Sequence, residues 1–320
     1  MISLRMQTLA DYVAYDAPST AEIARRTGLP AAEIIRFDGN TSPRAPVYAR
    51  AELLEGELAR IHTYPHGGYE GLAPAIARYA GVAPENVVLG AGADDVILLV
   101  IRSFAGRGDR VAIANDPTYP LFRIAVAVAG AEVGDADPAL TICCRPNNPT
   151  GELAPLPDAR PLLVDEAYYE YCGETAVDRI DDGVVVVRTF SKAFGLAGAR
   201  IGYALAGRDV ADELNRRQGP APVSTLSVAL ALAGLEQGPP DAAPIVEERE
   251  RLTAALQRLG LRPLPSQANF VALPLPDCAA VAERLLIRGI AVRPYRDGIR
   301  ITVRDAADDD RLLAALQSSL

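Results

Sequence analysis

Short apolar runs alternate with amphipathic stretches through the first two thirds of the chain. Almost continuous apolar runs predict buried strands. These runs lie within residues 86–92, 110–116, 139–147, 160–171, 183–191 and 199–207. Between the first three, residues 93–106 and 117–131 repeat apolar positions at helical spacing, and each stretch has a glycine near its end. Strands that alternate with helices predict an α/β domain whose mainly parallel sheet lies between helices.

The pattern changes after Arg208. Longer amphipathic helices are predicted at 245–260 and 277–289, and short strands lie between and after them. These strands are predicted at 269–275, 291–295 and 299–303. The change indicates a smaller α+β domain. We therefore divide the chain into an N-terminal segment (1–40) that packs on the small domain, a large domain (41–210) and a small C-terminal domain (211–320).

Residues 19–34 allow a different interpretation, because "STAEIARRTGLPAAEI" resembles the first half of a helix-turn-helix. Few residues precede it, which leaves little room for a three-helix DNA-reading head. The net charge of −9 also opposes a broad nucleic-acid surface. We favour an amphipathic helix at the edge of an enzyme.

Composition narrows the class of protein. Hydrophobic residues make up 49% of the 320 residues and charged residues 23%, as in ordinary soluble proteins. The four cysteines show no paired metal-ligand spacing, and there are only two histidines, so we expect no metal site. No apolar stretch has the length of a membrane span. These features predict a cytoplasmic protein without a nucleic-acid or membrane partner.

One residue type is almost missing. Lys192 is the only lysine among 32 basic residues, and arginine provides the other 31. A lysine amine can lose its proton and form an imine with an aldehyde, whereas a guanidinium stays protonated. Around it, "TFSKAFGLAGAR" supplies hydroxyls, glycines and Arg200, which suit a phosphate held close to the backbone. Lys192 is therefore a candidate catalytic residue.

Polar residues follow two of the predicted strands. Asn148 lies in "NNPTG" after one strand, and Asp165 ends the next, with Tyr168 three residues later. The carboxyl ends of parallel strands form the crevice where α/β sheets bind ligands. A carboxylate there is either a helix cap or a partner for a cation. A protonated pyridine nitrogen would be such a cation.

The first predicted strand leads into "GAGADD". Gly92, Ala93 and Asp94 stand at the start of a helix, where backbone N–H groups bind anions. A dinucleotide fingerprint is the alternative, but it needs a glycine where Asp95 stands. A phosphate is therefore favoured over a dinucleotide.

Taken together, these motifs resemble the fold-type I aminotransferases that use pyridoxal 5′-phosphate (PLP). The resemblance rests on "GAGADD", "NNPTG", "DEAY" and "SKAFGLAGAR" in this order, and it covers nearly the whole chain. The histidinol-phosphate aminotransferase subgroup is the most similar, through "RFDGNTSP", "SQANFVALP" and "GIRITV". The resemblance implies the PLP-transferase fold, with a seven-stranded type of sheet in a large PLP-binding domain.

The resemblance also implies residue roles. Lys192 would bind PLP as an imine and later move the Cα proton, Asp165 would pair with the pyridinium nitrogen, and Tyr168 would hydrogen-bond the ring oxygen. The rest of the cofactor shell would be Asn148 on the ring oxygen, Tyr119 on the ring face, and Gly92, Ala93, Asp94, Thr189, Ser191, Arg200 and Tyr64 around the phosphate. Tyr64 would come from the second subunit of a homodimer with shared active sites. The substrate would contact Asn40 and Arg300, with Arg293 as a lesser candidate.

The implied reaction transfers an amino group between an amino acid or phosphorylated amine and a 2-oxo acid such as 2-oxoglutarate. A related decarboxylase of an amino-acid phosphate and a non-catalytic ligand sensor are the alternatives. The chain departs from the subgroup in three places: it is short around 147–165, Ala221 replaces an expected aromatic residue, and the loop before Arg300 is brief. The last two lie on the expected substrate side.

Overall fold

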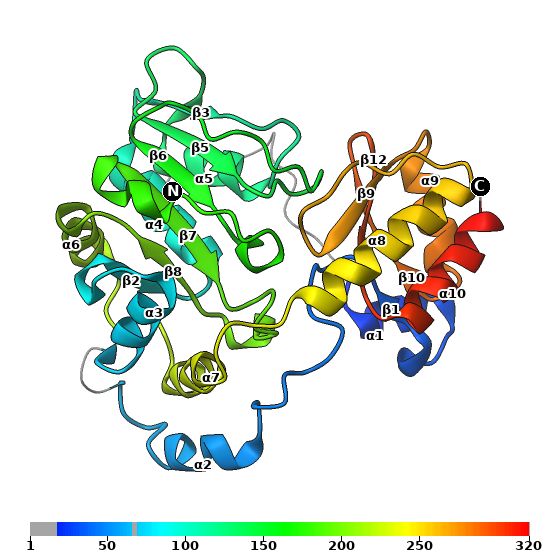
Figure 1. Ribbon diagram of the computed structural model, residues 1–320, viewed down its shortest axis with the longest axis horizontal. Coiled ribbons are helices and arrows are strands. Elements are labelled where there is room, and N and C mark those ends of the chain that lie inside the picture. The colour runs from blue at the N-terminus through cyan, green and yellow to red at the C-terminus, as the bar shows by residue number, and fades with distance from the viewer. Residues whose placement is uncertain (1–17, 66–68, 320) are drawn as a thin grey trace, which may run out of the picture.

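A seven-stranded sheet forms the centre of the larger part of the structure, a computed structural model that describes residues 18–65 and 69–319. In order across the sheet (Figure 1), the strands are β2 (Val87–Gly90), β8 (Gly202–Leu205), β7 (Val184–Thr189), β6 (Leu162–Asp165), β5 (Leu140–Cys144), β3 (Arg110–Ile113) and β4 (Glu132–Val133). Only β8 runs antiparallel to its neighbours, and the pairs from β7 to β4 are all parallel. The predicted mainly parallel α/β sheet is confirmed.

The central strands are buried on both faces, which explains their continuous apolar sequences. Every residue of β5, β6 and β7 is buried. Parallel strands covered by helices on both sides read as unbroken apolar runs because neither face meets water. The alternating pattern of a half-exposed strand is accordingly missing from Val184–Thr189.

Helices cover both faces of this sheet. The helices α4 (Ala93–Phe104), α5 (Leu121–Ala129) and α6 (Arg208–Arg217) share one apolar core with it. The other core includes residues of α3 (Leu72–Ala80) and α7 (Thr225–Glu236). Outside α7 lies α2 (Ala51–Ala59). Buried apolar area of this kind contributes about 25 cal/mol per Å² to stability, so the sheet is the main stabilising element of this part.

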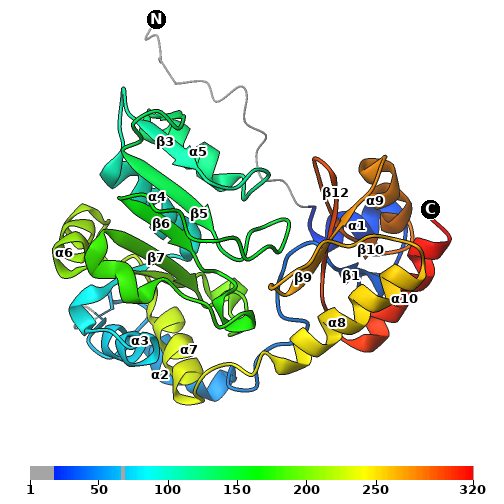
Figure 2. The ribbon, with the colours of Figure 1, turned by 45° about the horizontal axis from the view of Figure 1, so that its top comes forward.

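A second, smaller part lies beside the first (Figures 1 and 2). It contains the antiparallel sheet β11 (Arg293–Tyr295), β12 (Gly298–Thr302) and β9 (Phe270–Pro274), and the parallel pair β1 (Ile35–Arg36) and β10 (Ile290–Ala291). Its helices are α8 (Ala243–Arg258), α9 (Cys278–Leu286) and α10 (Ala306–Gln317). Alternate strand residues, including Val271, Ile299 and Ile301, fill the core beneath these helices. Arg300 therefore lies on the opposite face of the sheet.

The N-terminal segment joins the smaller part. Phe37 is fully buried in its core, and β1 extends β10. The first helix, α1 (Thr20–Thr27), buries Ile23 beside Ala291. A recognition helix does not follow it, because residues 31–33 form a single 3₁₀ turn that leads to β1. Residues 1–17 of the predicted segment lie outside the described residues.

The packing of helices α6 and α7 indicates where the boundary between the two parts lies in the sequence. Ala211 and Leu214 of α6 lie in the core of the large sheet, and so does Ala231 of α7 on its other face. An amphipathic pattern predicts a helix but not the sheet on which the helix packs. The sequence analysis therefore placed the domain boundary near residue 210, where the pattern changes. We propose that the large domain extends to about residue 240.

The connection from β5 to β6 is short. Residues 145–161 contain no helix or strand, although a helical crossover is usual between parallel strands. This agrees with the short chain around 147–165 that the sequence indicates. In the part of the chain that the structure describes, no helix combines the length and apolar composition required to cross a bilayer.

Asp309 is a buried carboxyl group in the small domain. Its side chain on α10 has no exposed surface. Burial, and then the neighbouring Glu248 carboxyl on α8, raise the pKa of Asp309 well above its ordinary range. Its proton is therefore retained in the folded protein at a pH where the unfolded chain has lost it. Such a group contributes stability below the ordinary carboxyl pKa, and this contribution is lost as the pH rises through the raised pKa.

We expect Asp309→Asn to remove part of the pH dependence of stability, because an amide has no proton to lose. Between about pH 5 and pH 9, the urea midpoint of the wild type should fall more steeply than that of the variant. Each unit of raised pKa corresponds to about 1.4 kcal/mol. The matched control is Asp310→Asn, since that neighbouring carboxylate is largely exposed. Parallel midpoint curves for wild type and Asp309→Asn would contradict the prediction.

Candidate active site

The carboxyl ends of three parallel strands bring the predicted site residues together. Asp165 is the last residue of β6, Thr189 is the last of β7, and Asn148 follows β5 in the next turn. Parallel pairing aligns Cys144 with Asp165 and Asp165 with Val187, so these ends lie at one edge. Lys192 follows three residues after Thr189. This is the edge where open α/β sheets bind ligands.

A cavity of about 100 Å³ lies at this edge. Twelve of the predicted site residues line it: Asn40, Ala93, Asp94, Tyr119, Asn148, Asp165, Tyr168, Thr189, Ser191, Lys192, Arg200 and Arg300. Gly92 lies next to the Arg200 guanidinium. Arg293 lines a neighbouring pocket of about 240 Å³ that shares Tyr119, Asn148 and Arg300. Residues up to 260 positions apart in the sequence thus surround one small space.

The amine of Lys192 faces two features of the cavity. Its Nζ donates to the backbone carbonyl of Gly39 at 3.2 Å and lies 5.7 Å from the Tyr168 ring centroid. Burial, and then the positive charge of Arg300, lower the pKa of Lys192 to about 8. Roughly a tenth of the amine is therefore unprotonated at pH 7, far more than for an ordinary lysine, and this is the form that attacks an aldehyde.

The carboxyl group of Asp165 is buried with few protein partners. The backbone N–H of Ala167 donates to Oδ1 at 3.1 Å, and the thiol of Cys144 lies 3.8 Å from Oδ2. Burial raises the pKa of Asp165 to about 7. A cation held next to this group would lower its pKa and offset the cost of burying the charge. The environment of Asp165 therefore fits a cationic ligand group.

Tyr168 is almost completely buried, and its hydroxyl accepts a hydrogen bond from Asn40 Nδ2 at 2.9 Å. Burial raises the pKa of Tyr168, so the phenol keeps its proton at neutral pH. The other aromatic residue of the cavity, Tyr119, donates to Asp94 Oδ1 at 3.0 Å. Arg200 pairs with the second oxygen of Asp94 at 3.1 Å. Tyr168 and Tyr119 thus bring two phenols to the cavity, and Arg200 brings a cation beside the start of α4.

Glycines allow the backbone to approach closely where the anion is expected. Gly92, with φ 93°, precedes α4, and a Cβ on it would lie 2.7 Å from the Arg200 guanidinium. A Cβ on Gly202 of β8 would lie 2.5 Å from the backbone nitrogen of Ala93. Thr189 and Ser191 add two hydroxyls 2.9 Å apart. A helix N-terminus, hydroxyls and an arginine form a site for a phosphate.

The position of Asp95 argues against a dinucleotide. Its carboxylate accepts the N–H of Ala91 at 3.0 Å, at the place where a dinucleotide fingerprint has its third glycine. The structure therefore favours a phosphate over a dinucleotide at the start of α4. Among the residues that the structure describes, no cluster of three or more histidine, cysteine or acidic side chains could hold a metal ion.

Arg300 enters the cavity from the small domain. Its guanidinium donates to Asn148 Oδ1 and to the carbonyl of Asp38, both at 2.5 Å. Its Nε is buried, and no acceptor among the described residues contacts it. Arg293 lies directly opposite Arg300 in the β11–β12 pair, so both side chains leave the same face of the sheet. Two like charges on one face favour an acidic ligand.

The brief loop before Arg300 is a two-residue turn, Arg296–Asp297, between β11 and β12. Arg296 reaches across to Asp116 of the large domain at 3.0 Å. The short turn between β11 and β12 thus contacts the large domain. Ala221 has φ 50° and is exposed, so its small side chain supplies no wall to the cavity.

Two contacts of the site were not predicted from the sequence. The acceptors for Lys192 and Arg300 are the backbone carbonyls of Gly39 and Asp38. Every residue has such a carbonyl, so no residue type marks these positions. Only the path of the chain after β1 brings them to the cavity.

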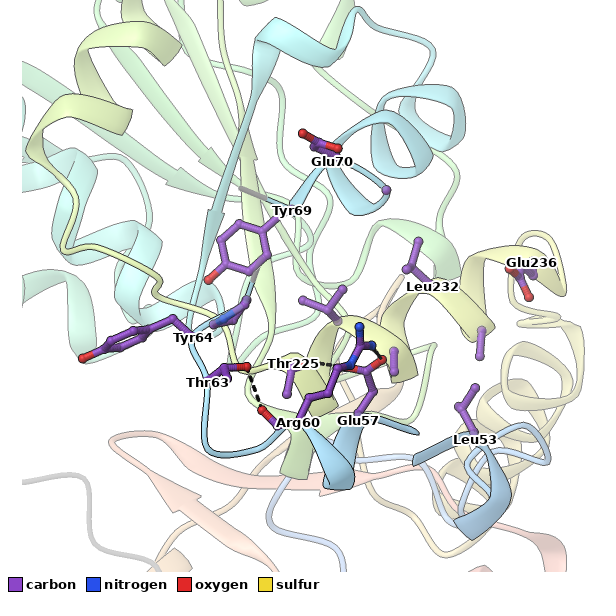
Figure 3. Close-up of a pocket in the computed structure, with 15 residues that line it drawn as sticks. Leu53, Glu57, Arg60, Thr63, Tyr64, Tyr69, Glu70, Thr225, Leu232 and Glu236 are labelled. Carbon is purple, nitrogen blue, oxygen red and sulfur yellow. Dashed lines mark hydrogen bonds and ion pairs between the residues drawn. The ribbon is translucent and has the colours of Figure 1, made fainter. Parts of the chain in front are cut away.

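Tyr64 does not line this cavity. Its side chain is 84% exposed, and Figure 3 shows the ring extending away from the chain. It borders a separate hollow of about 410 Å³ between α2 and α7, together with Glu57, Arg60 and Tyr69 (Figure 3). Lys192 and Asp165 do not line this hollow. Two of its polar groups, Thr225 and Arg60, donate to the Glu57 carboxylate.

Known proteins were compared with the chain. It matches the family "Aminotransferase class I and II" over residues 32–137 and 134–316. Histidinol-phosphate aminotransferase of Thermoanaerobacter pseudethanolicus is 34% identical over 301 residues, which cover 82% of this chain and 86% of the relative. The crystal structure of histidinol-phosphate aminotransferase from Sinorhizobium meliloti in complex with pyridoxal-5′-phosphate superimposes with a TM-score of 0.85. That match has 27% identity and covers 99% of this chain and 97% of that one.

A further solved structure shares the fold alone. L-threonine-O-3-phosphate decarboxylase from Porphyromonas gingivalis gives a TM-score of 0.78 at 21% identity, over 89% of this chain and 99% of that chain. Two different reaction types therefore occur on this architecture. The fold does not distinguish them, because function resides in the site.

We expect Gly92→Ala to weaken PLP binding about tenfold or more, because its Cβ would displace the Arg200 guanidinium from the start of α4. Equilibrium dialysis against PLP gives the dissociation constant. Gly108→Ala is the matched control: Gly108 has φ 94°, and nothing lies within 4 Å of its added Cβ. Both variants therefore carry the same backbone strain. Equal PLP affinity in the two would refute the role of Gly92.

Proposed function

Because the chain belongs to the class I and II aminotransferase family, it is a PLP-dependent transaminase, and we propose that its amino donor is a phosphorylated amine of the histidinol-phosphate type. The acceptor would be a 2-oxo acid such as 2-oxoglutarate. One observation supports the chemistry above all others: the only lysine of the chain and the buried Asp165 line the same cavity.

The residues present fit PLP at each end of the cavity. Asp165, buried with a raised pKa, suits the protonated ring nitrogen, and the cradle formed by Gly92 and Gly202 suits the phosphate. We propose that Ala93, Asp94, Thr189, Ser191 and Arg200 hold this phosphate and that Tyr119 contacts the ring. PLP, when bound, accepts the electrons left on the substrate when a bond to Cα breaks.

Lys192 is the residue that would hold the PLP aldehyde through its amine and would move the Cα proton. Its pKa of about 8 allows the amine to accept a proton and return it near neutral pH. The Gly39 carbonyl at 3.2 Å holds the Nζ at the cavity wall. A positioned general acid–base of this kind contributes about 10²–10⁴-fold in rate.

The substrate side is proposed to recognise acidic groups. Arg300 sits at the junction of the cavity and the neighbouring pocket, and Arg293 lies beside it on the same face of the sheet. A guanidinium binds carboxylate or phosphate through two parallel hydrogen bonds. A phosphorylated amine and a dicarboxylic 2-oxo acid both carry such a group. The relative's name supports the first of these as the amino donor.

We also propose a homodimer. Seven large apolar side chains are strongly exposed among the described residues, and four of them lie within 47–64: Val47, Leu58, Ile61 and Tyr64. Several exposed apolar side chains in one segment of the chain favour an interaction surface there. A second copy of the chain would cover it, and Tyr64 would then reach the phosphate of the partner's site. A cytoplasmic location is proposed as well, since all four cysteines are free thiols.

The first test measures whether the Lys192 amine binds PLP covalently. Wild type with PLP should show visible absorbance, and borohydride should fix one mass adduct on the peptide that contains Lys192, the sole lysine. Lys192→Arg, which keeps the charge but cannot form an imine, should lose the absorbance, the adduct and at least about 10²-fold of the rate. Retained turnover in Lys192→Arg would overturn the assignment.

The donor is identified by the same wild-type enzyme in single-turnover reactions. Histidinol phosphate should convert bound PLP to the pyridoxamine form faster than histidinol, because the arginines attract the phosphate. Release of carbon dioxide from threonine phosphate without pyridoxamine formation would instead favour the decarboxylase. If no amine gave either the pyridoxamine form or carbon dioxide, both reactions would be contradicted.

The second test uses mixed dimers. Lys192→Ala should be inactive, and Tyr64→Ala should be weakened in phosphate binding. When the two are mixed and re-equilibrated, heterodimers should hold one intact site, and about a quarter of the wild-type sites should be restored. Sedimentation velocity checks the dimer in each sample. Full activity in a monomer, or no recovery on mixing, would contradict shared sites.

A further inference from the structure

Three consecutive residues after β1 each contact one side chain of the active site. The carbonyl of Asp38 accepts from Arg300, the carbonyl of Gly39 accepts from Lys192, and Asn40 Nδ2 donates to the Tyr168 hydroxyl. The first two contacts use the backbone. Only Asn40 contributes a side chain, so only this contact depends on the residue type.

Asn40 is held firmly by the small domain. It is 1% exposed and has φ 50°, a left-handed conformation that asparagine adopts more easily than most residues. Its N–H donates to Thr302 Oγ1 at 2.9 Å, and its carbonyl accepts from Asn269 Nδ2 at 3.1 Å. The Thr302 hydroxyl also contacts Asn40 Oδ1 at 3.1 Å. The single proton of the Thr302 hydroxyl is also within reach of the Phe37 carbonyl at 2.7 Å. In this arrangement Asn40 directs its Oδ1 toward Thr302 and its amide N–H₂ toward Tyr168.

This orientation determines what the Tyr168 hydroxyl can do. A phenol oxygen that accepts the amide N–H still has its own O–H to donate elsewhere. The phenol keeps its proton at neutral pH because it is buried. Four other titratable groups surround it: Arg300, Cys144, Asp165 and Lys192. Within the described part of the chain, none of these four groups forms a hydrogen bond with the hydroxyl, and Tyr168 lines the cavity.

We infer that Asn40 is a positioning residue, which aims the Tyr168 hydroxyl into the cavity toward the ring oxygen of PLP, rather than a substrate ligand. The inference rests on the proposed role of Tyr168 in the PLP shell. Thr302 and Asn269 belong to the small domain and hold Asn40. A shift of the small domain would therefore move Asn40 and change its hydrogen bond to Tyr168.

The test measures the pH at which the visible absorbance of the PLP-bound enzyme changes. Donation by Tyr168 favours the form in which the ring oxygen is negative, so weaker donation should raise this pH. Asn40→Gly removes the amide while glycine retains the left-handed backbone. We expect an upward shift of about 0.5–1 pH unit, the equivalent of one ordinary hydrogen bond. Asn40→Asp, which accepts instead of donating, should shift it at least as far.

A double-mutant cycle separates positioning from general structural damage. Tyr168→Phe should shift the midpoint upward, and the double variant Asn40→Gly/Tyr168→Phe should match Tyr168→Phe alone, because Asn40 acts through that hydroxyl. An Asn40→Gly shift that persists in the Tyr168→Phe background would overturn the inference. So would an increased KM for the amine with an unmoved midpoint, since that result would make Asn40 a substrate ligand.

Asp137→Gly is the matched control. Asp137 is exposed, has φ 49° and lies on the loop before β5, so its replacement alters the backbone preference without touching the site. Its midpoint should equal that of the wild type. If the wild type shows no visible absorbance with PLP, the proposed function fails. If it does and Asn40→Gly behaves like the wild type, only the role of Asn40 fails.

Discussion

The burial of Asp165 at the end of β6 is the constraint on which the site depends. The surrounding strands exclude water from this carboxyl group, and this burial raises its pKa to about 7. A carboxylate at such a position is costly unless a cation lies beside it. We propose that the protonated ring nitrogen of PLP is this cation, so that its binding would offset the free energy lost in burying Asp165. The negative charge would in turn keep the ring nitrogen protonated.

The opposite end of the cavity depends on close backbone approach. β8 can lie against the start of α4 only because Gly202 has no side chain, and the start of α4 can meet Arg200 only because Gly92 has none. These contacts expose the first N–H groups of α4 to an anion. One end of the cavity thus favours a cation and the other an anion, and this polarity orients a ligand that carries both.

The small domain supplies the third element of the site. The strand that carries Arg300 and the segment 38–40 reach the cavity from the same side. They contact Asn148, Lys192 and Tyr168, which all belong to the large domain. A change in the relative position of the domains would therefore alter the substrate side and the cofactor side together.

The sequence by itself determined the buried strands, since unbroken apolar runs arise where a strand is covered on both faces. It also identified Lys192 and Asp165 as candidates, because few residue types can form an imine or pair with a cation. The tertiary structure decided the rest. The membership of α6 and α7 depended on packing partners that an amphipathic pattern does not specify. No residue type in the sequence identifies the backbone carbonyls of Asp38 and Gly39 as part of the site. The contact between Asn40 and Tyr168 joins residues 128 positions apart, and only the folded chain brings them together.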